Sequence, residues 1–391
     1  SFMKYINSKE DLAINGAPPA FKQNVCVGSP NVVDINKFIK YSKDIFDRNY
    51  LTNNGPLVVE LEKKVAEYHK VKHCIATCNG TVALEVAIKS LGLSGEVIVP
   101  SFTFIATAHA LNWLGVTPIF VDIDPNTHNI DVDSVRCAIT KNTTAIIAVH
   151  LWGRINSVEG LKNIADECNI KLIYDAAHAF GCTYNGTMVG NFGDCEILSF
   201  HATKIFNSFE GGAIMTNDSE LAKKARLMRN FGFSGEDNVV SIGTNGKMSE
   251  ISAAMGLSNI SHVDKLIYKN YKNYKIYSEE IDKIPQISLL KFDNYERNNY
   301  HYIVIELGKN CSVSRDYLIK VLRYENILAR RYFWPGCHKS KPYSDYSKNS
   351  ELVLKNTDIV SNNIIVLPSG AINERDIKTI TKIILIAVSI C

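Results

Sequence analysis

The sequence lacks the features that mark several large classes of protein. No apolar stretch reaches the ~18 residues that a membrane-spanning helix requires, and the first segment, SFMKYINSKEDL, has no apolar core of a secretory signal. The formal net charge of +3 is spread without long runs of one sign. No concentrated basic stripe of the kind that binds nucleic acid is therefore present. We expect a globular protein with neither a nucleic-acid nor a membrane partner.

The sequence also lacks paired cysteines and metal-ligand motifs. Its 10 cysteines include no CxxC pair, and several, such as Cys74 and Cys195, lie within apolar runs. Scattered thiols of this kind are typical of a reducing compartment, so we expect a cytoplasmic protein. There is no HExxH, no His/Cys cluster and no GxGxxG. We therefore expect no metal site.

What is present is a regular alternation of helix-like and strand-like segments between residues 57 and 175. Apolar runs such as EVIVP and KLIYD are separated by amphipathic segments such as VEGLKNIADECN. This pattern indicates βαβ units and a mostly parallel sheet, and hence an α/β fold.

The alternation of helix-like and strand-like segments changes after Asp175. Two shorter strands and a helix precede a Gly- and Asn-rich stretch, NFGFSGEDNVVSIGTNGKM, which we interpret as an ordered functional loop. A long helix is then predicted over residues 249–271, and the remainder resembles a smaller α+β domain. We place a large domain with the N-terminal segment at 1–268 and the small domain at 269–391.

Four short stretches lie at strand ends, where ligands bind in open α/β sheets. In CNGTVAL, residues 78–84, Asn79 can cap a helix and Gly80 lets a ligand approach the backbone closely. The first helical N–H groups, around Thr81 and Val82, can then bind an anion, although a plain capped helix start looks the same. In PSFTFIAT, residues 100–107, Phe104 is placed either to stack on a planar ring or to fill the core.

The other two stretches carry ionisable groups. Asp175 ends a strand in YDAAHAFG, as a helix cap or as an acid that keeps a pyridine nitrogen protonated, and His178 one turn later could bond a phenolic oxygen or be structural. In SFHATK, Lys204 follows Ser199 and an apolar strand; it is either a surface lysine or an amine that attacks an aldehyde. Together these groups meet the needs of one cofactor, pyridoxal 5′-phosphate.

The motifs NGTVAL, PSFTFIATAHA, YDAAHAFG, SFHATK with EGGAIMTN, and KMSEISAAMGL together resemble the DegT/DnrJ-type sugar aminotransferases. These are fold-type I pyridoxal-phosphate enzymes. The resemblance implies a three-layer, aspartate-aminotransferase-like large domain with a mostly parallel sheet. It also implies that Lys204 forms the Schiff base and moves the proton, and that Asp175 pairs with the pyridine nitrogen. The other implied cofactor contacts are Gly80, Thr81, Phe104, His178 and Ser199.

The resemblance further implies a homodimer in which a loop of the partner subunit completes each site. GTNGKM resembles that loop, and Asn245 is its expected cofactor contact. Family members more often have an Asn-Tyr-Arg run here, whereas this chain has Asn-Gly-Lys at 245–247. The chain therefore departs from the family pattern at the loop that is expected to cross the dimer.

Within the family, the chain looks like the transaminases that form dTDP-4-amino-4,6-dideoxyglucose. A branch that dehydrates sugars has a His in place of the lysine, so Lys204 favours transamination. The expected reaction is amination at C4 of dTDP-4-keto-6-deoxyglucose with L-glutamate as donor. Amination at C3 of a dTDP-3-keto-6-deoxyhexose, and a non-catalytic regulatory or binding protein of the same fold, are the alternatives. In the basic, aromatic stretch 329–343, Arg330 or Arg331 could meet a pyrophosphate or a donor carboxylate, or belong to a solvated or dimer-contact loop.

Overall fold

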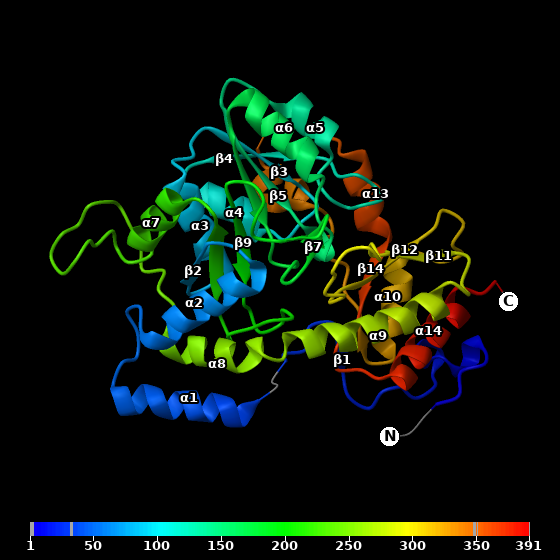
Figure 1. Ribbon diagram of the computed structural model, residues 1–391. Helices are drawn as coiled ribbons and strands as arrows, with labels where there is room; N and C mark the ends of the chain where they lie inside the picture. The colour runs from blue at the N-terminus through cyan, green and yellow to red at the C-terminus, as the bar shows by residue number, and fades with distance from the viewer. Residues whose placement is uncertain (1–3, 32–33, 347–348, 350, 391) are drawn as a thin grey trace.

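A seven-stranded sheet forms the centre of the larger part of the molecule (Figure 1). The computed structural model describes residues 4–31, 34–346, 349 and 351–390. The strand order is β2-β10-β9-β6-β5-β3-β4, and only β10 runs antiparallel to its neighbours. The strands are β2 (His73–Thr77), β3 (Glu96–Pro100), β4 (Thr117–Val121), β5 (Thr143–Val149), β6 (Lys171–Asp175), β9 (Cys195–Ser199) and β10 (Gly212–Thr216). The expected mostly parallel sheet is confirmed.

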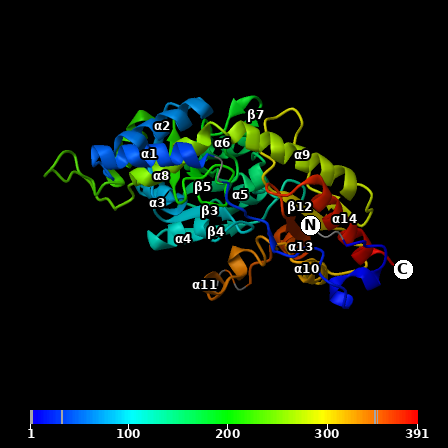
Figure 2. The ribbon, with the colours of Figure 1, turned by 90° about the horizontal axis from the view of Figure 1, so that it is seen from below.

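Helices cover both faces of this sheet, because its strands are apolar on both sides. On one face α3, α4 and α7 pack against alternate strand residues such as Val97 and Ile147. On the other face α2 and α8, and beside them α5 and α6, pack against the intervening residues such as Ala76 and Ile146. Figure 2 shows the strands between α2 and α8 on one side and α4 on the other. The three-layer α/β architecture is therefore the one expected from the sequence.

The helices of this part begin with side-chain caps at several positions. Asn79, Asp131 and Asp218 each accept a hydrogen bond from a backbone N–H of the first turn. The helices are α1 (Ile35–Arg48), α2 (Pro56–His69), α3 (Gly80–Ser90), α4 (Ala106–Trp113), α5 (Val132–Ala138), α6 (Val158–Cys168), α7 (Ser219–Met228) and α8 (Glu250–Ile260). Shorter elements are the 3₁₀ turn η3 (Leu151–Gly153) and the hairpin β7 (Thr183–Tyr184) and β8 (Thr187–Met188).

The C-terminal part is built on a small antiparallel sheet with the order β11-β12-β14. The N-terminal segment packs here, since Ile6 and Leu12 belong to the same apolar core as this sheet and its helices. Its elements are η1 (Lys9–Asp11), η2 (Ala13–Asn15), β1 (Val25–Cys26), α9 (Val263–Ile281), β11 (Ile287–Leu289), β12 (Ile303–Leu307), α10 (Arg315–Tyr324), β13 (Ile327–Leu328), η4 (Cys337–Lys339), α11 (Lys341–Ser344), α13 (Lys355–Asn363), β14 (Ile364–Leu367) and α14 (Glu374–Val388).

The single long helix predicted over residues 249–271 is wrong in its bounds. α8 ends at Ile260, and α9 begins at Val263 and continues to Ile281. The two helices face different environments: α8 is buried among α1 and α2, whereas α9 leaves the large sheet and packs on α14. The strand β11 was not predicted, because it is only three residues long. The proposed domain boundary at 268 lies within α9 and remains a prediction.

The Gly- and Asn-rich stretch after α7 extends away from the body of the molecule (Figure 1). Isolated β-bridges between Asn230 and Asn245 and between Phe233 and Val239 give it an ordered shape. Among the helices that the structure describes, none combines the length and the apolar character needed to cross a bilayer.

Candidate active site

The N-terminus of α3 opens into a cavity of about 320 Å³ at the carboxyl ends of the strands. Asn79 caps the helix by accepting the N–H of Val82 at 2.8 Å, so the expectation that this N–H binds an anion is wrong. The N–H groups of Gly80 and Thr81 have no partner within the described chain. The strands crowd this turn closely: a Cβ added at Gly212 would lie 2.5 Å from the backbone N of Gly80. The result is a narrow cup of backbone donors at the positive end of a helix, which suits a phosphate.

Asp175 lies in the middle of the cavity at the end of β6. Its carboxylate accepts hydrogen bonds from the Thr107 hydroxyl and from the N–H of Ala177, both at 3.1 Å. Burial raises the pKa of the Asp175 carboxyl, although these two hydrogen bonds and the nearby charge of Lys204 act in the opposite direction. The carboxylate is therefore fixed in orientation and would be further stabilised by a cation placed against it.

His178 is a neutral hydrogen-bond donor toward this cavity. Its Nδ1 accepts the backbone N–H of Trp152 at 3.1 Å, so the ring proton is carried by Nε2. Burial, together with the charge of Lys204, lowers the pKa of His178 well below its ordinary value. The ring is also fixed by Tyr302, whose ring centroid lies 4.3 Å away.

Lys204 follows β9 in a short loop. The backbone N–H of Lys204 donates to the carbonyl of His201 at 2.9 Å, and the carbonyl of Thr203 accepts from His301 Nε2 at 2.8 Å. Among the described residues the Lys204 amine has no hydrogen-bond or ion-pair partner, although it lines the cavity. An amine held at a cavity wall without a counter-ion is free to react with a ligand.

Phe104 stands at the mouth of the cavity with 59% of its surface exposed. The structure therefore places it over the ligand space rather than in the core. Its ring centroid lies 6.3 Å from that of Phe333, which comes from the C-terminal part of the chain. The two rings lie beside each other where the cavity adjoins the groove described below.

The structure brings together seven of the eight residues proposed for the site. They line one cavity and are Gly80, Thr81, Phe104, Asp175, His178, Ser199 and Lys204. Asn245 does not line it: it is bridged to Asn230, and its side-chain oxygen accepts a bond from Lys247 Nζ at 2.6 Å. Asn245 is expected to contact the cofactor of a partner subunit, and this contact remains a prediction.

Sequence reasoning missed several lining residues. Thr107 was within reach, because it follows Phe104 by three residues in a motif already singled out. His201 and Glu210 flank Lys204 and line the cavity as well. Tyr332 and Phe333 lie in the basic, aromatic stretch 329–343, of which only the arginines were considered as ligand contacts. No local pattern pointed to Tyr302, which also comes from the C-terminal part of the chain.

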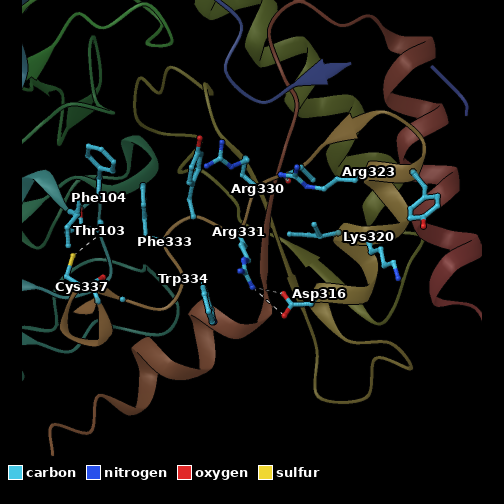
Figure 3. A pocket seen from close by; sticks show the side chains of 17 residues that line it. Thr103, Phe104, Asp316, Lys320, Arg323, Arg330, Arg331, Phe333, Trp334 and Cys337 are labelled. Carbon is cyan, nitrogen blue, oxygen red and sulfur yellow. Dashed lines mark hydrogen bonds and ion pairs between the residues drawn. The ribbon is translucent and has the colours of Figure 1, made fainter. Parts of the chain in front are cut away.

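A larger groove of about 990 Å³ adjoins the cavity and shares Thr103, Phe104, Tyr332 and Phe333 with it. Figure 3 shows its basic and aromatic wall. The Arg331 guanidinium lies 3.9 Å from the centre of the Trp334 ring and 3.3 Å from Asp316. Arg330 lies 4.7 Å from the Tyr332 ring centre. The remaining cationic lining residues are Lys320 and Arg323.

A three-layer α/β fold with an amine and a carboxylate lining one cavity at the strand ends is the architecture expected of an α/β-class aminotransferase. The family model described as the DegT/DnrJ/EryC1/StrS aminotransferase family matches residues 33–385. The chain belongs to this family, and the resemblance seen in its motifs is confirmed.

Related proteins align with most of the length of this chain. A dTDP-4-amino-4,6-dideoxy-D-glucose transaminase of Shigella dysenteriae is 39% identical over 353 residues, which are 90% of this chain and 96% of the relative. A GDP-perosamine synthase of Caulobacter vibrioides is 36% identical over 314 residues, covering 78% and 83%. The crystal structure of DesI in the presence of its TDP-sugar product superposes with a TM-score of 0.93 at 40% identity, covering 97% and 96%.

Proposed function

We propose that this chain is a pyridoxal-phosphate-dependent transaminase that aminates a nucleotide-linked keto-deoxy sugar, with L-glutamate as donor. The specific substrate we propose is dTDP-4-keto-6-deoxyglucose, aminated at C4. The observation that carries the proposal is the convergence of the Lys204 amine, the Asp175 carboxylate and the α3 N-terminus on one cavity that opens into a basic groove.

The residues of the cavity fit the cofactor group by group. The free N–H groups of Gly80 and Thr81, with the Ser199 hydroxyl nearby, would hold the phosphate. The carboxylate of Asp175 would keep the pyridine nitrogen protonated, and the Nε2–H of His178 would donate to the phenolic oxygen. When bound, the cofactor supplies an aldehyde that bonds to amines and a ring that accepts electrons.

Lys204 provides the acid–base chemistry. Its amine would hold the cofactor through the cofactor's aldehyde and, once released by the amino donor, would take the proton from the donor's Cα and later deliver a proton to the sugar carbon that receives the amine. Acid–base catalysis of this kind contributes about 10²–10⁴-fold to the rate. Phe104 and Phe333 at the entrance limit the access of water, which protects the reaction from hydrolysis.

The adjoining groove supports a nucleotide-linked substrate. Its cations at Arg330 and Arg331, with Lys320 and Arg323 further along, suit a diphosphate, and the exposed ring of Trp334 suits a planar base. The substrate of the Shigella dysenteriae relative and the TDP-sugar of the DesI crystal structure favour a dTDP-linked sugar and amination at C4.

The active form that we propose is a homodimer with shared sites. Two apolar surfaces support it: α1 exposes Ile35, Ile39 and Phe46, and the extended loop exposes Val239 and Ile242. Exposed apolar surface of this extent is typical of an interface. In the dimer, the loop would bring Asn245 to the cofactor of the other subunit.

One assay tests the proposed reaction and its substrate. The purified protein is first mixed with L-glutamate, and the visible absorbance of the bound cofactor should bleach. Keto sugars linked to dTDP, UDP and GDP are then added separately, and the new amine is located by NMR. An amine at C4 of the dTDP sugar is expected; an amine at C3 would replace the substrate assignment, and an unchanged spectrum with glutamate would contradict the activity.

A further inference from the structure

The wall of the groove is a segment, residues 330–334, that is held at both ends by parts of the chain far away in sequence. At its start, Arg330 exchanges two backbone hydrogen bonds with Val366 of β14, at 3.0 and 2.8 Å. Just after its end, Cys337 and His338 attach to Ser101, which follows β3 of the large sheet. The groove wall therefore bridges the C-terminal sheet and the large sheet.

The attachment at Ser101 is a compact, fully buried contact. The Ser101 carbonyl accepts the N–H of Cys337 at 2.8 Å, and its hydroxyl oxygen accepts the N–H of His338 at 3.0 Å. Ser101 Oγ also lies 2.6 Å from His338 Nδ1. The Ser101 hydroxyl can donate to Nδ1 or accept from it, so either neutral tautomer of His338 completes this bond. His338 Nε2 is buried without a hydrogen-bond partner among the described residues. Ser101 and His338 are 0% and 1% exposed, so water cannot replace these bonds.

Ser101 and His338 lie beside both ligand spaces and line neither, whereas their neighbour Cys337 lines the groove. Ser101 precedes Thr103 and Phe104, which line the cavity and the groove alike. Cys337 Sγ contacts the Thr103 carbonyl at 3.4 Å, as Figure 3 shows. The turn is tight as well, since a Cβ on Gly336 would lie 3.1 Å from Ser101 Oγ. Loosening this contact would shift the groove wall relative to Phe104.

We propose that the Ser101–His338 hydrogen bond is a positioning contact that sets the nucleotide groove in register with the cofactor cavity. The inference rests on the proposed function. Its consequence is specific to one substrate: the small amino donor needs only the cavity, whereas a nucleotide-linked sugar must occupy cavity and groove at once. Loss of the contact should weaken binding of the sugar and leave the reaction with the donor unchanged.

The test compares Ser101→Ala with a matched control, Tyr343→Phe, in the homogeneous holoenzyme. The control removes another hydrogen bond that joins the C-terminal part to the large-sheet part, between the Tyr343 hydroxyl and His109 Nδ1 at 2.6 Å. Tyr343 lines neither the cavity nor the groove. Three quantities are measured: the rate of bleaching with L-glutamate, KM and kcat for dTDP-4-keto-6-deoxyglucose, and the Kd of dTDP by calorimetry.

Ser101→Ala removes both hydrogen bonds of the Ser101 hydroxyl, and we expect KM and the Kd of dTDP to rise about tenfold or more. The bleaching rate should stay at the wild-type value, and Tyr343→Phe should leave all three quantities unchanged. If Ser101→Ala does not fold, His338→Leu removes the bond between Oγ and Nδ1 from the other side, keeps the backbone bond to Oγ, and is read in the same way.

Three results would overturn the inference: a wild-type KM and Kd in the folded variant, an equal rise in Tyr343→Phe, or a bleaching rate reduced as much as KM rises. A wild-type chain that aminates no nucleotide-linked keto sugar would overturn the proposed function and this inference together. A wild-type chain that does so, with an unaffected Ser101→Ala, would overturn this inference alone.

Discussion

Lys204 and Asp175 line one cavity, yet among the described residues they form no ion pair with each other. Asp175 is held instead by Thr107 and by the N–H of Ala177. A direct pair would neutralise both groups and close the space between them. Keeping them apart leaves an amine on one side and a carboxylate on the other, as a ligand with an aldehyde and a basic ring nitrogen requires.

The amine of Lys204 is the group whose loss should be most severe. In Lys204→Ala we expect the visible absorbance of the bound cofactor to disappear and turnover to fall by at least ~10²–10⁴-fold. The control is Lys224→Ala, on the exposed side of α7, which should have wild-type absorbance and turnover. Retained transamination in Lys204→Ala would refute the assigned role.

Asp175→Asn separates binding from catalysis. The amide keeps the size of the side chain but cannot hold a pyridine nitrogen protonated, so we expect the cofactor to remain attached while kcat falls by about 10²-fold or more. Absorbance spectra and steady-state kinetics measure the two effects. A variant with wild-type kcat would show that the carboxylate does not serve the ring nitrogen.

At the scale of elements, the start of α3 does two things at once. Asn79 caps the helix through the N–H of Val82, and the same turn presents the N–H groups of Gly80 and Thr81 to the cavity. The side-chain cap satisfies one donor and so leaves the other two for a ligand. The orientation of the Gly80 and Thr81 N–H groups thus depends on the Asn79 cap.

A pair of N-cap variants isolates this second role. Asn79→Ala and Asn373→Ala each remove an Asn cap, of α3 and α14 respectively, and each should lower the free energy of unfolding by ~1 kcal/mol. Only Asn79→Ala should also weaken binding of pyridoxal phosphate, measured by fluorescence titration of the apoprotein. Equal cofactor affinity in the two variants would contradict a phosphate site at α3.

At the scale of the whole molecule, the site exists only because the two parts of the chain meet. The large sheet supplies Asp175 and Lys204, whereas Tyr302, Tyr332 and Phe333 close the cavity from the C-terminal part. An apolar core between them, which includes Phe102, Trp152 and Val304, joins the two. Stability of this joined state is therefore a condition for activity.

The free energy of unfolding should decrease in acid because imidazoles such as that of His69 are buried in the neutral form. Its Nδ1–H donates to the Val65 carbonyl and its Nε2 accepts the N–H of Gly181, both at 3.0 Å, so it is neutral in the folded chain. Burial lowers the pKa of His69 to about 4 from 6.5. As the pH falls, the unfolded chain therefore binds a proton at His69 before the folded chain does. The resulting contribution of His69 to the free energy of unfolding, ~3 kcal/mol, is present above pH 6.5 and is lost as the pH falls toward 4.

Chemical denaturation of wild type and His69→Gln at several pH values between 7 and 4 checks this. The variant should be less stable at pH 7, because Gln fits the two hydrogen bonds less well, but its stability should depend less on pH across this window. An equally steep decline in both proteins would assign the acid sensitivity to other groups.

The sequence by itself determined those features that depend on short-range interactions. The strand and helix pattern follows from local periodicity, and a parallel sheet brings the carboxyl ends of its strands to one edge. Gly80, Phe104, Asp175 and Lys204 could therefore be grouped into one site from the sequence alone, because each follows a recognisable strand.

Only the tertiary structure decided what lies opposite these residues. Tyr302 and Phe333 reach the cavity through the packing of the C-terminal part on the large sheet, and Ser101 meets His338 across 237 positions of sequence. The break between α8 and α9 has the same origin, since helical periodicity continues through residues 261 and 262 while the packing partners change. Contacts between distant segments depend on how preformed faces fit together, and no local pattern records that fit.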